Sequence, residues 1–501
     1  SAQQLFKDGQ HPNGRGWYFV TMVQVAAITG RSPEGLPPKL TRTWASRDAI
    51  ISGPQAQAMQ RIAWQAVSSY APPKQTATAV PMPADPTAPL PAFAPIVNPN
   101  LSLGLAGIND WSVQQPFLDV MKTARPWIGH LPGQFGGWEM ADLERVGAVG
   151  PHGWPVAIPP EVTSLSTLIL TDLPADAGGV AGRYVLTYQG KGDLKLEGRA
   201  QVVQAEAGRI LFDYTPGDGF VAITLTRLDA TDPIHAISVV RSEREAELAA
   251  GKIFNPDWLA RIRGVKGIRF MDWMAINNSP LSETADRPMP DDFTYGRNGV
   301  PVEVMVALAN ELQADPWFTL PHLATDDLVR TYAQITHDSL DPALAAHVEF
   351  SNEVWNWQFA QAKWAEEQGR ARWGQDQTWV QFYAFRAAQV MDIWAQVFAD
   401  APDRLLRIIA TQTGWLGLED QILNAPLVIA EGAPTPASHF DAYAVTGYFS
   451  ALLGADEKAG MVRDWIAKSK ASDPANPNAL ANQLAAQELR DGSISGDPSD
   501  S

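Results

Sequence analysis

Apolar residues recur along the second half of the chain in a pattern that predicts alternating strands and helices. Short apolar runs, typical of buried strands, occupy residues 101–107, 267–273, 317–321, 347–350, 405–411 and 440–445. Helical spacing occupies residues 302–313, 325–336 and about 357–399, between these runs. Such alternation favours a parallel sheet or a (β/α)₈ barrel. Six of the eight barrel strands are predicted, so we expect a TIM-barrel-like α/β domain that is incomplete at its C-terminal end.

The period of the pattern changes to two between about residues 163 and 242. Runs rich in Val, Ile, Leu and Tyr alternate there with Gly or Asp turns, as at residues 183–188, 210–214 and 221–225. This predicts a small antiparallel β module inserted after the first barrel strand. It could shape a binding cleft or serve as a structural elaboration alone.

A proline-rich segment separates two predicted domains. Residues 72–99 hold nine prolines, and their charged residues are Lys74 and Asp85. This composition predicts a semi-extended linker, with a loop wrapped over one domain as the alternative. We therefore expect one domain at residues 1–71 and a second at residues 100–501.

Composition excludes several kinds of chemistry. The 501 residues carry a formal net charge of −17 and include no cysteine, so disulfide scaffolds, thiolate metal sites and cysteine nucleophiles are excluded. Such an acidic chain is a poor candidate for binding nucleic acids, because contacts to the phosphate backbone need an excess of Lys and Arg. It contains no apolar run long enough to span a bilayer, and neither a phosphate-binding loop nor a dinucleotide fingerprint is present. No cofactor is therefore expected, and the first residues given show no targeting signal.

The sharpest chemical motif follows the predicted strand at 347–350. Residues 350–356 read Phe-Ser-Asn-Glu-Val-Trp-Asn, which places Asn352 and Glu353 at the carboxyl end of a barrel strand, where barrel enzymes keep their chemistry. The motif resembles that of the retaining glycoside hydrolases of the (β/α)₈ clan with cellulase-like families. There, the fourth strand ends in Asn-Glu. The resemblance covers roughly residues 100–501 and implies that Glu353 is the acid/base and that Asn352 holds the sugar 2-hydroxyl.

Further residues acquire roles from the same resemblance. Arg269 matches the clan's second-strand arginine, which contacts the nucleophile, and Tyr448 matches the tyrosine that hydrogen-bonds it. His322 follows the third predicted strand and is a candidate for the same mouth. Each residue has an alternative role. Arg269 could form a structural ion pair, Tyr448 could be a core aromatic residue, and His322 could be an ordinary loop histidine.

The second carboxylate of a retaining enzyme is harder to place. In the resembling families it ends the seventh strand, but no strand followed by Glu occurs after Tyr448. The apolar run at 427–430 precedes Glu431, which we interpret as a loop residue and the weaker candidate for the nucleophile. We therefore expect the nucleophile to lie beyond Ser501 and this chain to be a fragment.

Aromatic residues offer candidate sugar contacts. The chain contains 18 Trp, as many as Phe. Trp355, Trp357 and Trp273 lie nearest predicted strand ends, and indole rings can stack on apolar sugar faces. Most other Trp at helical spacing are expected in the core.

The N-terminal domain carries a motif of its own. Asp8-Gly-Gln-His11 resembles the last block of SGNH-type esterases, in which Asp orients a general-base His. The resemblance implies that residues 1–71 are the C-terminal part of an α/β SGNH hydrolase-like domain. A metal site at Asp8 and His11 is not expected because further ligands are missing nearby.

Together the two resemblances imply an enzyme that hydrolyses β-glycosidic bonds of a polysaccharide by the retaining route, with ester removal by the upstream domain as a coupled activity. The alternative is a non-catalytic carbohydrate-binding or scaffold protein that lacks a complete carboxylate pair. The expected partner is a poly- or oligosaccharide, not a nucleic acid or a membrane, and the expected location is extracellular or in the cell envelope.

Overall fold

The structure is a computed structural model that describes residues 18, 19, 22, 23, 26, 31–36, 53–70, 100–412, 414–446, 452–474 and 476–495. The chain divides into two compact units, one formed by residues 1–84 and 447–501 and the other by residues 85–446. The predicted linker at 72–99 lies outside the described residues. The predicted domain of residues 100–501 included residues 447–501, which the structure groups with the N-terminal unit.

The first unit is helical where it is described. It contains α2 (Gly53–Tyr70), α11 (Ala459–Ser472) and α12 (Ala479–Asp491). Gln60 of α2 is buried and donates to the Tyr18 hydroxyl at 2.6 Å, and Asn482 of α12 donates to Gln65 of α2 at 3.2 Å. These contacts join segments from opposite ends of the chain, but they do not show an SGNH fold.

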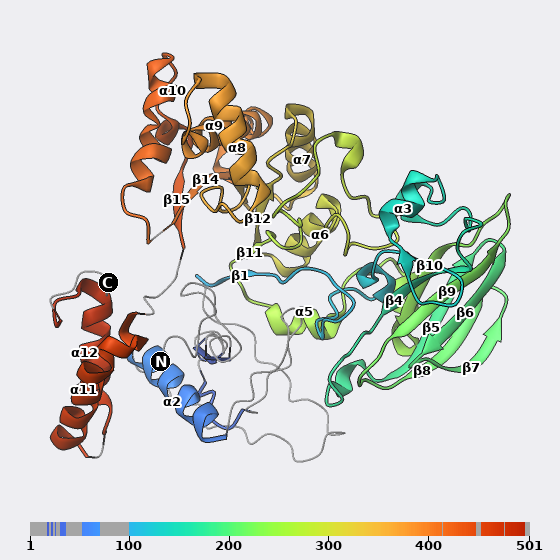
Figure 1. Ribbon diagram of the computed structural model, residues 1–501, viewed down its shortest axis with the longest axis horizontal. Helices are drawn as coiled ribbons and strands as arrows, with labels where there is room; N and C mark the ends of the chain where they lie inside the picture. Colours follow the sequence, from blue (N-terminus) through green and yellow to red (C-terminus); the bar gives the residue numbers. More distant parts are fainter. Residues whose placement is uncertain are drawn as a thin grey trace. The chain divides into compact units, whose positions relative to one another are not determined.

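The second unit is α/β and is built on a curled, parallel half-barrel sheet (Figure 1). Its described strands are parallel and adjacent in chain order. They are β1 (Ser102–Gly104), β11 (Gly267–Arg269), β12 (Asp315–Leu320), β13 (Ala346–Phe350), β14 (Leu405–Thr411) and β15 (Ala442–Val445). The six predicted strands and their order are therefore confirmed.

Helices cover one face of this sheet. They are α5 (Pro256–Ile262), α6 (Val302–Leu312), α7 (Asp326–Ser339), α8 (Ala360–Trp373), α9 (Trp379–Val397) and α10 (Pro426–Ala430). Phe318 packs against Trp394 of α9, and Phe350 packs against Tyr383 of α9. Side chains alternate between the two faces of a strand. Trp317, next to Phe318, and Glu349, next to Phe350, therefore point to the opposite, concave face. Within the described residues, no helix is long and apolar enough to cross a bilayer.

The β module contains two antiparallel sheets and begins earlier than predicted. The sheets have the orders β10-β5-β8-β7 and β3-β2-β4-β9-β6. The strands are β2 (Ile128–His130), β3 (Gly137–Trp138), β4 (Ser164–Ile169), β5 (Gly182–Gln189), β6 (Gly192–Gly198), β7 (Gln201–Glu206), β8 (Arg209–Tyr214), β9 (Val221–Leu228) and β10 (His235–Arg241), with the short helix α3 (Met140–Arg145) after β3. One apolar core joins both sheets, for example through Leu165 and Ile223 of one and Phe212 and Val239 of the other.

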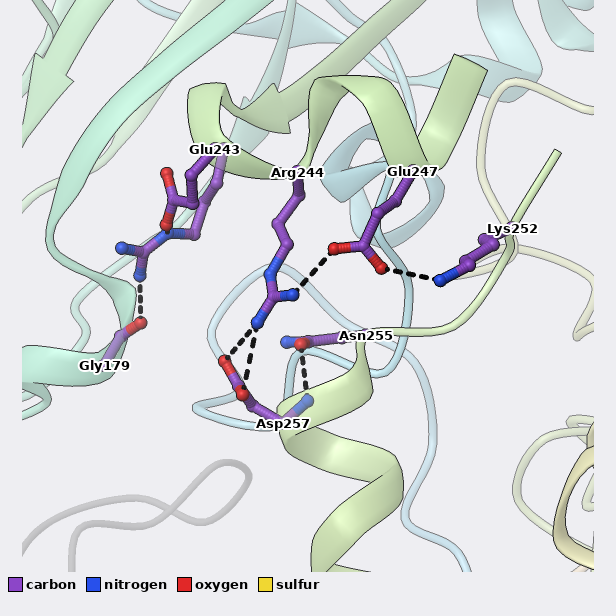
Figure 2. A network of polar contacts seen from close by, with 8 residues as sticks. Gly179, Glu243, Arg244, Glu247, Lys252, Asn255 and Asp257 are labelled. Carbon is purple, nitrogen blue, oxygen red and sulfur yellow. Dashed lines mark hydrogen bonds and ion pairs between the residues drawn. The ribbon is translucent and has the colours of Figure 1, made fainter. Parts of the chain in front are cut away.

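A polar network fixes the return from the β module to the half-barrel (Figure 2). Arg244 contacts Glu247 of α4 (Glu245–Ala249) at 2.7 Å and Asp257 of α5 at 3.3 Å. Lys252 donates to the other oxygen of Glu247, and the Asn255 side chain caps α5. Exposed ion pairs of this kind add little stability singly. Here they link α4, the loop after it and the start of α5.

Two short segments beside the sheet are helical turns. Val120–Thr123 forms a 3₁₀ turn that the side chain of Asp119 caps by accepting from the Met121 amide. The strand-like run before Glu431 is the helix α10, because Pro426 at its first turn favours a helical start. Glu431 lies in the turn after this helix, in agreement with its interpretation as a loop residue.

Candidate functional site

The predicted motif lies at the carboxyl end of β13, in a strained turn. The Ser351 amide still pairs with the carbonyl of Leu320 on β12, at 2.8 Å, so the sheet persists to this point. Ser351 and Glu353 both have left-handed backbone angles, with φ of 60° and 43°. Asn356 closes the turn, since its amide donates to the Glu353 carbonyl and its side chain donates to Glu353 Oε2 at 2.9 Å. Left-handed non-glycine residues cost free energy and cluster at functional sites.

The side-chain amide of Asn352 is held in one orientation. Arg269 Nη2 donates to Asn352 Oδ1 at 3.1 Å, and Asn352 Nδ2 donates to Asn277 Oδ1 at 3.1 Å. Gln361 of α8 donates both to Asn277 Oδ1 and to the Asn352 carbonyl. An amide has two donor hydrogens and two acceptor lone pairs. One side-chain N–H and one Oδ1 lone pair of Asn352 therefore have no partner among the described residues.

Arg269 itself is anchored by a carboxylate that the sequence patterns did not single out. Glu349 of β13 is 2% exposed, and its Oε2 accepts from Arg269 Nη2 at 2.9 Å, Arg269 Nε at 3.2 Å and Trp317 Nε1 at 2.9 Å. Burial raises the pKa of Glu349, the Arg269 charge opposes that rise, and the Glu353 charge adds to it. In the sequence, Glu349 could have been found as an acidic residue inside an otherwise apolar predicted strand.

Asp272 adds a third carboxyl group to this region. It lies three residues after β11, and burial raises its pKa while the Arg269 charge lowers it. Arg269 thus interacts with Asn352, Glu349 and Asp272. The alternative prediction that Arg269 forms a structural ion pair agrees with its contact to Glu349, but the same guanidinium also positions Asn352.

The three candidate tryptophans lie in different environments. Trp273 is 1% exposed and stacks on Trp258 with ring centroids 5.9 Å apart, so it is a core residue with no free face for a sugar. Trp355 is also buried. Trp357 is 46% exposed and is the candidate of the three whose ring a ligand can reach.

His322 follows β12 and is buried against Trp364 of α8, with ring centroids 5.5 Å apart. Burial lowers its pKa to about 4. Unfolding would therefore allow this ring to take up a proton near pH 6.5, whereas the folded protein resists protonation until about pH 4.

We expect this histidine to make folding stability fall as the pH drops from 6.5 toward 4, by up to about 3 kcal/mol. The loss should be smaller in a His322→Gln variant, which cannot take up that proton. Urea unfolding at pH 7 and pH 4.5, followed by fluorescence, measures the difference. An equal loss in both proteins would contradict the assignment.

Other sequence candidates lie elsewhere. Asp8, His11 and Tyr448 are outside the described residues. Glu431 accepts from Arg372 Nη2 at 2.7 Å and from Trp373 Nε1 at 3.0 Å, at the end of α8. These partners give Glu431 a structural role as an ion pair between α8 and the turn after α10.

A second pair with catalytic residue types occurs in the β module. His130 Nε2 lies 2.7 Å from Ser166 Oγ, and both residues are buried. However, His130 Nδ1 accepts the Gly136 amide at 2.8 Å, which leaves the ring proton on Nε2 to bond Ser166. A hydrolytic triad needs the opposite arrangement, with Nδ1 donating to an acid. The pair therefore serves the fold. Across the described ranges, no cluster of three or more metal-ligating side chains is found.

Comparison with known protein families, with curated proteins and with solved structures gave no match for this chain.

Proposed function

We propose that the chain contributes the sugar-binding and acid/base half of a retaining β-glycosidase site that acts on a polysaccharide. The observation that carries the proposal is the pairing of a fixed amide with a carboxyl group at a strand end. Asn352 is oriented by Arg269 and Asn277, and Glu353 follows it in a strained turn after β13. Barrel enzymes keep their chemistry at this end of the strands.

In this proposal Glu353 acts twice. It first protonates the leaving glycosidic oxygen, and its carboxylate then removes a proton from the water that attacks the glycosyl intermediate. The remaining N–H or lone pair of Asn352 holds the sugar 2-hydroxyl, whose hydrogen bond strengthens as positive charge develops at the anomeric carbon. Asn356, which donates to Glu353 Oε2, helps to hold the carboxyl group in place.

Retaining chemistry also needs a nucleophilic carboxylate about 5–5.5 Å from the acid/base. In the resembling families it comes from the seventh strand, and the described sheet ends with its sixth strand, β15. We propose that this carboxylate comes from outside the described residues. Ester removal that involves Asp8 and His11, and action outside the cell, remain proposals that rest on the sequence alone.

One observation favours the second candidate, a carbohydrate-binding protein without hydrolytic activity. Glu349, the other acid on β13, is buried and its Oε2 is already bonded to Arg269 and Trp317. A site in which Glu349 stays bonded in this way, and in which neither Asp272 nor another acid attacks the sugar, could bind a sugar without cleaving it.

The deciding experiment is hydrolysis of neutral β-glucans, β-xylans and β-mannans by the complete protein, with product anomers followed by NMR. We expect cleavage with the β-anomer formed first. Initial formation of the α-anomer would exclude the retaining mechanism. Binding of a glycan without cleavage would support the second candidate instead.

A further inference from the structure

Three tryptophans form a row beside the candidate site. The ring centroids of Trp357 and Trp379 are 5.0 Å apart, and those of Trp379 and Trp415 are 6.2 Å apart. Trp357 belongs to the loop after β13, Trp415 belongs to the loop after β14, and Trp379 begins α9 between them. Because β13 and β14 are adjacent parallel strands, both loops leave the same end of the sheet. We call these three residues the tryptophan row.

The outer members of the row are exposed although the fold offers apolar cores. Trp357 is 46% exposed and Trp415 is 44% exposed, and the adjacent Leu416 is 90% exposed. Exposed apolar patches on a folded protein commonly mark binding surfaces. Trp379 is 9% exposed and contacts both outer rings.

Two indole N–H groups in this region have no acceptor. Among the described residues, Nε1 of Trp379 and Nε1 of Trp355 are buried without a hydrogen-bond partner. Buried donors are normally bonded, and an orphaned donor costs free energy. Both belong to the row or to the turn that carries it. Outside the row, Trp127 and Trp394 also have buried Nε1 atoms without a partner among the described residues, so this feature is not specific to the surface.

The row is continuous with the proposed acid/base. Trp357 directly follows Asn356, whose side chain donates to Glu353 Oε2 at 2.9 Å. A chain molecule lying on the row would therefore reach Glu353 at one end. A flat ligand with apolar faces fits such a surface, since its C–H groups can face the negative π-clouds of the exposed rings.

We propose that the tryptophan row is an extended subsite for a neutral, β-linked glycan chain that enters or leaves the Glu353 site. This assignment rests on the proposed function for its orientation toward Glu353. A neutral glycan is favoured over an anionic one because the chain carries a net charge of −17. Equatorially linked β-sugars expose broad apolar faces at regular intervals, so they can use two rings at once.

The test compares Trp357→Ala and Trp415→Ala with wild type in the complete protein. The probes are cellohexaose, xylohexaose and mannohexaose, with binding measured by calorimetry. Removing one stacked ring should weaken binding of the preferred hexasaccharide about tenfold. Phe135→Ala, which removes a 61% exposed aromatic ring from the β module, is the matched control and should leave binding unchanged. Trp415→Phe should retain much of the affinity.

The outcomes separate this inference from the proposed function. If the row variants lose hexasaccharide affinity and raise KM on the polymer, while kcat on a short aryl β-glycoside is unchanged, the subsite is supported. If wild type binds but does not hydrolyse, and the row variants lose binding, the subsite holds and the hydrolase proposal fails. If hydrolysis depends on Glu353 but both row variants bind and cleave like wild type, the subsite is overturned and the hydrolase stands. Absence of binding to all three hexasaccharides would also overturn the subsite.

Discussion

A Glu353→Gln protein is expected to hydrolyse an unactivated β-glycan roughly 10²–10⁴-fold more slowly than wild type. Glutamine keeps the size of the side chain and can still accept the hydrogen bond that Asn356 donates to Glu353 Oε2. It cannot deliver a proton to the leaving oxygen or remove one from water. The loss should therefore appear in kcat, with hexasaccharide affinity near that of wild type.

The role of Glu353 is separated from a general loss of structure by a chemical rescue. With an aryl glycoside whose leaving group needs no proton, Glu353→Ala should still form the glycosyl intermediate and then stall. Added azide attacks that intermediate without a general base, so it should restore turnover and give a glycosyl azide. Glu367→Gln, which changes an exposed acid on α8, is the matched control and should keep wild-type activity. Hydrolysis of the β-glycan by Glu353→Gln at the wild-type rate would rule out the acid/base assignment.

The largest effect on stability is expected from Arg269→Met. This change leaves Glu349 buried without its cation, and loss of one partner of a buried ion pair typically costs about 3–5 kcal/mol. The contact between Arg269 and Asn352 is lost as well, so the amide that we assign to sugar binding loses its orientation. Urea unfolding followed by tryptophan fluorescence measures the first effect. The KM for a cleaved glycan measures the second.

Two comparison variants identify the cause of that loss. Arg269→Met with Glu349→Gln removes the buried charge and keeps an acceptor for Trp317 Nε1, so it should regain much of the lost stability. Arg372→Met breaks the half-exposed pair with Glu431 and should cost about 0–1 kcal/mol. The penalty of Arg269→Met should shrink at low pH, because a protonated Glu349 no longer carries a charge. An Arg269→Met protein within 1 kcal/mol of wild type at neutral pH would contradict the buried ion pair (about 3–5 kcal/mol expected).

The parallel sheet could be predicted from the sequence because its strands are buried on the helix-covered face and are separated by helices with clear spacing. The predicted run at 347–350 and the observed Ala346–Phe350 differ by one residue. The β module was placed correctly between β1 and β11, but its first strands were missed. The strands β2 and β3 have three and two residues, which is too short to show a period of two. The apolar stretch that forms α10 was ambiguous, because so short a stretch can form either a strand or a helix.

The candidate site could be predicted in part. A strand followed by Asn-Glu placed Asn352 and Glu353 at the strand end, as observed. The contact between Arg269 and Glu349 depends on side chains from two strands that are not adjacent in the sheet, and a one-dimensional pattern does not reveal it. The same holds for the contacts of Trp379 with Trp357 and with Trp415, which lie in different segments and form only after folding. Trp273, predicted at the site, is buried because three aromatic neighbours enclose it.

The position of the β module has a consequence for biosynthesis. Leu103 of β1 pairs with Ile268 of β11, about 165 residues later, so at 5–20 residues per second β1 leaves the ribosome roughly 10–30 s before its partner. The module is complete within that interval and has its own core. It can therefore fold first and bring its two ends together, which shortens the loop that β1 must close. In nascent chains that stop before residue 267, we expect the β module to resist proteolysis and β1 to be cleaved.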